Sequence, residues 1–385
     1  MTASASTSPV SVGIIGAGKI SGIYLENSKK FSTFDVVAIA DVRVDGAEAR
    51  AREYGIPEAM SVDALLAHPE VEAIINLTPH RVHGPVGISV VEAGKAVYTE
   101  KPIVVLREEG QRLLDLAAAT HVRVGGAPDT FFGGAWQTAR KAIDDGAIGR
   151  PFAAFANLHI RPIPRPAGAP PPPSQSVDQP GYRSFYATEN FEYGGGAIFD
   201  RGPYYLNALI HLLGPVVNVT GSATKTWEER DLGGEMRPVN VPTHVVGVLT
   251  FANGAVCTLT MSNDVLATGL PHIEIYGTEG SLRCIDPNEF TGDIQLRTLE
   301  DPEFRTLPIA FPYNGNSRGV GVADMAAAMR SGRPHRATGA MAYHVVDIIT
   351  AIFDASATGQ TVELTSTCDQ PAPLPKGLSD WEIDA

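Results

Sequence analysis

The sequence predicts an α/β first domain with a doubly wound parallel sheet, followed by a second domain rich in β-strands. Three observations predict this. The chain has 385 residues, enough for about two domains that each bury a core. Residues 12–125 alternate short apolar runs with helix-forming stretches, as repeated βα units do. Beyond residue 150, several short segments instead alternate apolar and polar side chains.

Composition and charge exclude several classes of protein. The net charge is −13 and the pI is near 5.2, which argues against an extended basic surface for nucleic acid or an anionic membrane. No apolar run approaches the ~20 residues of a membrane span. The N-terminus, MTASASTSPV, lacks the basic and apolar regions of a secretory signal. We expect a cytoplasmic protein, with no nucleic-acid or membrane partner.

The cysteines support the same compartment. There are three, Cys257, Cys284 and Cys368, and their spacing fits neither a metal site nor a disulfide framework. An odd, sparse set is typical of buried thiols in a reducing environment.

A glycine turn follows the first apolar run. Residues 12–15 are followed by Gly-Ala-Gly-Lys-Ile-Ser-Gly and then a helical stretch. Gly16 permits a tight turn, Gly18 lets the backbone approach a pyrophosphate, and the helix N-terminus beyond offers unpaired N–H groups. Such turns occur in many loops, so the surrounding sequence decides whether this turn binds a dinucleotide. We expect five turn residues to contact a dinucleotide: Gly16, Gly18, Lys19, Ile20 and Ser21.

The second strand, residues 36–40, ends at Asp41, 23 residues after Gly18. A carboxylate at this place accepts hydrogen bonds from the ribose hydroxyls and repels a 2′-phosphate, which predicts NAD as the cofactor. The alternative is that Asp41 only caps the next helix. Arg43, also a candidate cofactor contact, would weaken the discrimination against NADP.

The alternation then continues through the first domain. We expect helices at 61–67, with Ser61 as N-cap, at 83–94 and at 107–120, and strands at 73–77, 96–99 and 122–125. Ligands bind outside the carboxyl ends of strands in such a Rossmann sheet. Four chemically useful residues follow these ends: Thr78, Pro79, Lys101 and Asp129.

These residues resemble a known family. The glycine turn, Asp41, Thr78–Pro79, Glu100-Lys101-Pro102 and the later run Gly194–Tyr204 (GGGAIFDRGPY) are similar to the signatures of the Gfo/Idh/MocA oxidoreductases, over roughly residues 10–365. The family is named for glucose–fructose oxidoreductase and inositol dehydrogenase. The resemblance implies an NAD-dependent oxidoreductase acting on a sugar-like substrate.

The resemblance also implies a second domain with an open, mainly antiparallel β-sheet. Its free face commonly packs against another subunit, so we expect a homodimer or homotetramer. The β-rich segments are 152–160, 216–226, 243–251, 255–262, 272–276 and 281–284. We divide the chain into a flexible N-terminus (1–10), an NAD-binding domain (11–130), a substrate-binding and oligomerisation domain (131–370) and a C-terminal tail (371–385). Helices at 132–145 and 338–357 should link the two domains.

Three catalytic roles follow from the resemblance. Lys101 would hydrogen-bond the reacting oxygen and supply positive charge, and the following Pro102 favours an extended backbone or a cis bond. Asp200 would bind a neighbouring substrate hydroxyl. Tyr204, one helical turn beyond Asp200 and on the same face, would transfer a proton. The alternatives are a solvated surface lysine at residue 101 and a tyrosine that only lines the substrate wall.

Two residues depart from the common family pattern. Many members have histidine at the position of Tyr204, although relatives of glucose–fructose oxidoreductase and dihydrodiol dehydrogenase use tyrosine there. A free tyrosine has a pKa of about 10, and a nearby ammonium ion lowers the pKa of a tyrosine. Asn207 replaces a common aspartate.

Further residues are candidate ligand contacts. The cofactor set at the strand ends comprises Leu77, Thr78, Pro79, His83, Glu100 and Lys101. The additional substrate candidates are Asp129, Gln137, His159 and Arg161. His80 and His83 form an H-x-x-H pair, but no third ligand is close in sequence, so we expect no metal.

The segment 161–182 is proline-rich, with four prolines at Pro170–Pro173. It favours polyproline II over sheet, and two interpretations stay open: a surface loop, or a lid or arm reaching a neighbouring active site. Four arginines surround the predicted pocket in sequence and suggest an anionic substrate group: Arg161, Arg165, Arg183 and Arg201.

Three functions therefore remain as alternatives. The first is a dehydrogenase or ketoreductase acting on a sugar, glycoside or cyclitol. The second is an NAD-dependent glycoside hydrolase that oxidises a hydroxyl, eliminates the aglycone, adds water and returns the hydride. The third is a non-enzymatic NAD-binding sensor, which the presence of Lys101, Asp200 and Tyr204 disfavours.

Overall fold

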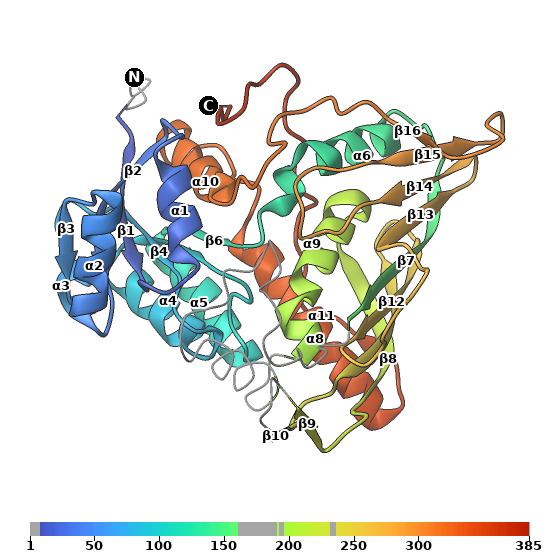
Figure 1. The fold of residues 1–385 in the computed structure, drawn as a ribbon, viewed down its shortest axis with the longest axis horizontal. Helices are drawn as coiled ribbons and strands as arrows, with labels where there is room; N and C mark the ends of the chain where they lie inside the picture. The colour runs from blue at the N-terminus through green and yellow to red at the C-terminus, as the bar shows by residue number, and fades with distance from the viewer. Residues whose placement is uncertain (1–7, 161–190, 192–195, 232–235, 385) are drawn as a thin grey trace, which may run out of the picture.

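The structure is a computed structural model that describes residues 8–160, 191, 196–231 and 236–384 (Figure 1). The proline-rich segment and Arg161, Arg165 and Arg183 lie outside the described residues. The chain forms two main sheets, one in each half.

The first sheet has six strands in the order β3-β2-β1-β4-β5-β6, and every neighbouring pair is parallel. Its central strands are almost entirely buried, as expected for a sheet covered on both faces. The strand bounds are β1 Val10–Ile15, β2 Phe34–Ala40, β3 Glu58–Met60, β4 Ala73–Asn76, β5 Ala96–Thr99 and β6 Val124–Gly126. This is the parallel Rossmann sheet that the sequence predicts.

Helices connect these strands, and their ends follow local sequence signals. The side chain of Ser61 accepts a hydrogen bond from the amide of Ala64, which confirms it as an N-cap. Helix α5 has the bounds that the sequence predicts. The helices are α1 Ser21–Ser28, α2 Val44–Tyr54, α3 Val62–Leu66, α4 His83–Glu92 and α5 Arg107–Thr120, with 3-10 turns η1 His80–Val82 and η2 Thr130–Phe132.

The second main sheet has nine strands in the order β16-β15-β14-β13-β7-β12-β11-β8-β17. All its neighbouring pairs are antiparallel except β7 and β12, which run parallel. The strands are β7 Pro151–His159, β8 Val216–Thr224, β11 His244–Phe251, β12 Val256–Ser262, β13 Ile273–Gly277, β14 Gly280–Cys284, β15 Gln295–Thr298, β16 Arg305–Thr306 and β17 Val362–Glu363. A separate pair is formed by β9 Glu229–Asp231 and β10 Met236–Pro238. The prediction of an open, mainly antiparallel sheet is confirmed.

The two faces of this sheet differ. Helices lie against one face, where Cys257, Leu259 and Met261 of β12 are fully buried. The opposite face presents Phe155 and Val248, which are 44% and 42% exposed. The covering helices are α6 Gly134–Asp144, α8 Gly196–Asp200, α9 Gly202–Leu213 and α11 Gly339–Thr358.

Two helices and the tail join the second half of the chain to the first sheet. Helix α10 (Val320–Ser331), which the sequence analysis does not anticipate, contacts β6, and α11 contacts α5, β6 and β8. Helix α6 packs on α9, on β14 and on the η2 turn that follows β6. Helix α11 has the length and mean hydropathy, 1.3, of a membrane span, but 67% of its apolar stretch is buried inside the protein.

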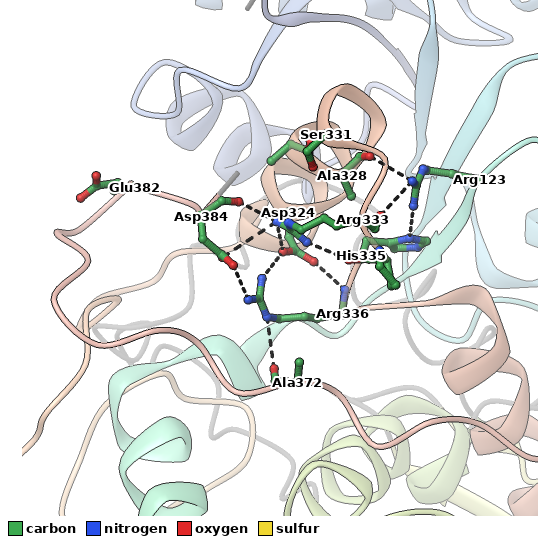
Figure 2. Close-up of polar contacts among 12 residues, drawn as sticks. Arg123, Asp324, Ala328, Ser331, Arg333, His335, Arg336, Ala372, Glu382 and Asp384 are labelled. Atoms are coloured by element: carbon green, nitrogen blue, oxygen red, sulfur yellow. Dashed lines mark hydrogen bonds and ion pairs between the residues drawn. The ribbon is translucent and has the colours of Figure 1, made fainter. Parts of the chain in front are cut away.

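The C-terminal tail is anchored rather than free. The ring of Trp381 lies 5.1 Å from that of Phe31 in the first domain. Figure 2 shows buried Asp324 between Arg333 and Arg336, with Asp384 of the tail bonded to the same arginines. The three cysteines are buried and free, as the sequence predicts.

Candidate active site

The glycine turn has the geometry that its residues predict. Gly16 has φ +110°, and a Cβ there would lie 2.6 Å from the carbonyl oxygen of Leu77, so only glycine fits. Ser21 is fully buried, and its hydroxyl donates to the carbonyl of Gly18 at 2.7 Å. A small hydroxyl residue therefore takes the packing place of a third glycine.

The outer side of the turn is open to a ligand. A Cβ on Gly18 would meet no protein atom within 4 Å, and Lys19 and Ile20 beside it are exposed. Helix α1 begins just beyond without a side-chain cap on its N-terminus. These features fit the pyrophosphate of a dinucleotide, which would take the approach along Gly18 and the amides at the start of α1.

Asp41 is anchored over this turn. Its Oδ2 accepts the amide of Ala17 at 2.8 Å, and its Oδ1 accepts the amide of Arg43 at 2.9 Å. Helix α2 starts after Arg43 and has no side-chain cap, so Asp41 does not serve as the cap of that helix. The carboxylate is partly exposed, in the position where it would meet the ribose of the cofactor. Next to it, Val42 is 91% exposed, an apolar surface that the sequence analysis overlooks.

The end of β4 is braced by His83. The two ring nitrogens of His83 lie 2.6 Å from the carbonyl oxygens of Thr78 and Pro102. The ring is 2% exposed, and burial lowers its pKa. The expectation that His83 contacts the cofactor is therefore corrected: its nitrogens hold two strand ends together. Leu77, Thr78 and Pro79 remain at the strand end beside the glycine turn, and a cofactor contact for them stays a prediction.

Glu100 is also internally engaged. One carboxylate oxygen accepts the hydroxyl of Tyr24 at 2.9 Å, and the other accepts the amide of Lys101 at 2.8 Å. The side chain thus links helix α1 to the residue before Pro102 and fixes the backbone of Lys101. The Lys101–Pro102 bond is cis, one of the two conformations expected there.

Lys101, Asp200 and Tyr204 come together. The Nζ of Lys101 donates to Oδ1 of Asp200 at 2.7 Å and to its carbonyl oxygen at 2.6 Å. The same Nζ lies 5.4 Å from the centre of the Tyr204 ring, within cation–π range. The alternative of a solvated surface lysine is wrong, because the Lys101 side chain is 16% exposed and ion-paired.

The charge of Lys101 is set by two opposing effects. Burial lowers its pKa, but the negative charge of Asp200, followed by Tyr204 and Glu100, outweighs burial and raises the pKa above its ordinary value. Lys101 is therefore an ammonium ion at neutral pH, a donor and cation rather than a base. Nearby His80 has its pKa lowered to about 4 by burial, with His83 and Lys101 adding to the effect.

Asp200 and Tyr204 do not share one continuous helix. Asp200 is the last residue of α8, and α9 starts at Gly202 with a proline in its first turn. The expectation of a shared face on one helical turn is corrected in this respect. Lys101 nevertheless touches both residues across the break, so the predicted grouping holds.

Two residues predicted to contact the substrate form hydrogen bonds within the protein instead. Gln137 is fully buried, and its amide group bonds the carbonyl of Phe131 and the amide of Leu374. Asp129 is 1% exposed, and its Oδ2 accepts the amides of Gly319 and Gly321 at 2.8 and 3.0 Å. Both expectations are corrected, because these polar groups hold the protein's own backbone.

The other candidates lie at different distances from this group. His159 ends β7 with its pKa lowered by burial and by His244, and contact with a substrate stays a prediction for it. Arg201 lies 5.8 Å from the Tyr204 ring and 3.5 Å from a carboxylate oxygen of Asp286. Asn207 donates to the carbonyl of Pro128 at 3.0 Å. Over the described ranges, no group of three His, Cys, Asp or Glu side chains is placed to hold a metal ion.

Sequence reasoning missed Arg318. It lies in the segment before α10, and its guanidinium hydrogen-bonds Asn288 and lies 5.8 Å from the Phe290 ring. An isolated arginine in an irregular segment carries no motif, so no sequence signal could have identified it.

The fold and the site define an NAD-binding oxidoreductase. Residues 10–126 match the family model described as "Oxidoreductase family, NAD-binding Rossmann fold", and residues 136–283 match the "GFO/IDH/MocA C-terminal domain". The chain belongs to the Gfo/Idh/MocA family.

Curated relatives and solved structures agree with this assignment. A 1,5-anhydro-D-fructose reductase of Ensifer adhaerens is 26% identical over 91% of this chain and 98% of that protein. A myo-inositol 2-dehydrogenase of Thermotoga maritima is 23% identical over 73% of this chain and 76% of that protein. In structure, levoglucosan dehydrogenase in complex with NADH and L-sorbose shares the fold, with a TM-score of 0.76 and 22% identity, covering 93% of this chain and 99% of that chain.

Proposed function

We propose that this chain transfers a hydride between NAD and a secondary hydroxyl or ketone of a sugar, glycoside or cyclitol. The observation that carries the proposal is the contact of one partly buried ammonium group, Lys101, with both Asp200 and the Tyr204 ring. A hydride transfer of this type needs a cation or donor at the reacting oxygen and a group that exchanges its proton. NAD, when bound along the glycine turn, supplies or accepts the hydride.

Lys101 fits the first requirement. An ammonium group has three donors, and the two bonds to Asp200 use a carboxylate oxygen and a carbonyl oxygen as acceptors. We assign its remaining N–H to the reacting oxygen, where its charge stabilises a developing alkoxide. Asp200 keeps the amine protonated, and its carboxylate is the acceptor we assign to an adjacent substrate hydroxyl.

Tyr204 fits the second requirement. It is 7% exposed, so its proton exchanges within a largely water-excluded site. In the direction of reduction, the phenol gives its proton to the carbonyl oxygen. In the direction of oxidation, the phenolate takes the hydroxyl proton. Proton transfer of this kind contributes about 10²–10⁴-fold in rate.

The relatives support the substrate class. Their names refer to an anhydro-sugar reductase and an inositol dehydrogenase, and the L-sorbose complex contains a sugar. An anionic substituent on the substrate remains a hypothesis, because the one described arginine of the four, Arg201, already faces Asp286.

The test is a screen of the full chain with NAD⁺ against sugars, cyclitols and aryl glycosides. Absorbance at 340 nm and aglycone release are followed together. NADH accumulation supports the proposal. Aglycone release without net NADH would instead support the NAD-dependent glycosidase, and cofactor binding with neither product would support a sensor.

Variants assign the roles once a substrate is found. We expect activity to fall at least 100-fold in Lys101→Ala and Asp200→Ala and clearly in Tyr204→Phe. Lys141→Ala, on the surface of α6, is the matched lysine control and should keep full activity. Full activity in Tyr204→Phe would mean that Tyr204 only lines the substrate site and transfers no proton.

We also propose a homo-oligomer that covers the open face of the nine-stranded sheet. Phe155 of β7 lies in register with Thr258 of β12, and Thr258 in register with Val248 of β11. The exposed apolar side chains are therefore contiguous across strands rather than scattered, which marks an interaction surface. A second copy of the same face would cover it.

A further inference from the structure

Tyr24 lies on the helix that begins at the glycine turn. It belongs to α1, is 2% exposed, and its hydroxyl donates to Oε1 of Glu100 at 2.9 Å. The two residues are 76 positions apart in the sequence, so the bond joins separate parts of the first domain. Burial, followed by the charge of Glu100, raises the pKa of Tyr24 well above its ordinary value. The phenol is therefore neutral and acts as a donor.

Glu100 divides its carboxylate between two donors. Oε1 accepts the hydroxyl of Tyr24, and Oε2 accepts the backbone amide of Lys101 at 2.8 Å. The backbone amide of Glu100 donates to the carbonyl of Asn76 at the end of β4, at 3.0 Å. Glu100 is 8% exposed, and a buried carboxylate oxygen that loses its donor is not fully rehydrated. Both bonds are therefore needed to keep this carboxylate in one place.

The two ends of Lys101 have different carboxylate partners. Its backbone amide is held by Glu100, and its Nζ donates to Oδ1 of Asp200 at 2.7 Å and to the carbonyl oxygen of Asp200 at 2.6 Å. The flexible side chain between these points is fixed at both ends. A lysine side chain has high rotamer entropy, so this double anchoring limits where the amine can lie.

Helix α1 gives Tyr24 a fixed position. At the start of the helix, the hydroxyl of Ser21 donates to the carbonyl of Gly18 at 2.7 Å. At its end, Nδ2 of Asn27 donates to two carbonyls of the segment before α10, both at 2.9 Å. Tyr24 lies between these anchors, so the position of Glu100 follows that of the helix which begins at the glycine turn.

We propose that Tyr24 is a positioning residue for Lys101: its hydroxyl fixes the Glu100 carboxylate, which in turn fixes the backbone from which the amine reaches Asp200. The proposal rests on the role of Lys101 in the proposed function. Without the hydroxyl, the Glu100 carboxylate turns to regain a donor and releases the amide of Lys101. The side chain is then held only at its far end, and the amine spends part of its time away from Asp200.

The test measures how firmly the amine is held and needs no substrate. The full chain is labelled competitively with acetic anhydride at one fixed pH, and the rate is read on the peptide that contains Lys101. Tyr24→Phe removes only the hydroxyl. We expect Lys101 to be acetylated about fivefold faster than in the wild type, the factor that corresponds to one lost hydrogen bond.

Lys95 is the internal reference for this measurement. It is a lysine of the same domain, 7% exposed, whose Nζ donates to the carbonyls of His68 and Val71 at 2.6 and 2.7 Å. Its acetylation rate should not change in Tyr24→Phe. An equal rise at Lys95 and Lys101 would mean that the variant loosens the whole domain, and the positioning role would be wrong.

Tyr276→Phe is the matched control variant. It removes the same kind of bond, from a tyrosine hydroxyl to Oε2 of Glu274 at 2.6 Å, but in the nine-stranded sheet. It should leave the labelling of Lys101 unchanged. Equal rates for Lys101 in the wild type and in Tyr24→Phe, or an equal rise in Tyr276→Phe, would overturn the proposal.

A second variant covers the case in which Tyr24→Phe does not fold. Glu100→Gln keeps one acceptor oxygen for two donors, so the same faster labelling of Lys101 is expected, and an unchanged rate overturns the proposal. Once a substrate is known, Tyr24→Phe should lower kcat with KM nearly unchanged, and a rise in KM alone would contradict a positioning role. A failed substrate screen would count against the proposed function but leave the labelling result unaffected.

Discussion

The Nζ of Lys101 lies 2.7 Å from Oδ1 of Asp200, and the two residues belong to different domains. Lys101 follows the last residues of β5 in the parallel sheet, whereas Asp200 ends α8 on the covered side of the nine-stranded sheet. This ion pair therefore exists only when the two domains are assembled. It also determines the protonation state of the amine, because burial alone would lower the pKa of Lys101.

The first prediction concerns Asp200→Asn. The negative charge of Asp200 is the strongest of the charges that raise the pKa of Lys101. Without it, the lowering effect of burial should prevail, and the pKa of Lys101 should fall. The wild-type amine stays protonated past pH 10, so the positive charge of Lys101 and its ion pair with Asp200 are present throughout the neutral range and are lost only at high pH. In the variant, the protonated form should be lost at lower pH. Competitive labelling with acetic anhydride, read on the peptide that contains Lys101, measures this without a substrate.

Asp115→Asn, an exposed carboxylate on α5, is the control for that measurement. It should leave the labelling of Lys101 unchanged between pH 6 and 10. If Lys101 labels with the same pH dependence in the wild type and in Asp200→Asn, the ion pair does not set its charge.

The second prediction concerns cofactor choice. Asp41→Asn removes the negative charge and keeps only one of the two oxygens that accept the amides of Ala17 and Arg43. We expect NADH to bind about tenfold more weakly and NADPH to bind more tightly, because repulsion of the 2′-phosphate is lost. Protein-fluorescence quenching by the two cofactors gives both dissociation constants. Asp45→Asn, in the first turn of α2, is the control, and an unchanged NADH-to-NADPH ratio in Asp41→Asn would contradict the assignment.

The local units of the first domain were predictable because each lies in one continuous stretch of sequence. The glycine turn, the N-cap at Ser61 and the helix at Arg107–Thr120 each depend on neighbours a few residues away. The grouping of Lys101 with Asp200 and Tyr204 was predicted in another way. These residues lie in two motifs that are far apart in sequence, and the family resemblance places both motifs at one site.

Features that depend on distant contacts were not predictable. Asp129 accepts the amide of Gly319 across a sequence separation of 190 residues. Helix α10, rich in small apolar residues, has no side-chain cap of its own and begins where that carboxylate holds it. Gln137 on α6 accepts the amide of Leu374 and Asp129 after β6 accepts the amide of Gly319, and no local sequence signal reveals such distant partners.

The third prediction uses the buried carboxyl of Asp129. Burial raises its pKa to about 6, although the amides of Gly321 and Gly319 and the charge of Arg318 oppose the rise. An aspartate with a raised pKa stabilises the fold only while it is protonated. Its contribution is therefore present below pH 4, the unfolded value, and is lost as pH rises through about 6.

Asp129→Asn should remove this dependence, because the amide oxygen still accepts both backbone amides and carries no charge. Between pH 4 and pH 7.5 the wild type should lose about 2.5 kcal/mol more unfolding free energy than the variant. Urea unfolding of both proteins at the two pH values gives the double difference, in which the groups common to both proteins cancel. An equal change in the two proteins would show that Asp129 ionises normally.

The fourth prediction concerns the open face of the nine-stranded sheet. Phe155 pairs in register with Glu274 of β13, so Phe155→Asp sets two carboxylates opposite each other and removes an exposed aromatic ring. If this face joins two copies of the chain, the variant should shift toward monomer while each subunit stays folded. Light scattering after size exclusion measures the mass, and circular dichroism checks the fold. Leu106→Asp, an exposed leucine of the first domain, is the control and should keep the wild-type mass. A wild-type chain that is already monomeric, or a Phe155→Asp variant with unchanged mass, would mean that another surface or none joins the subunits.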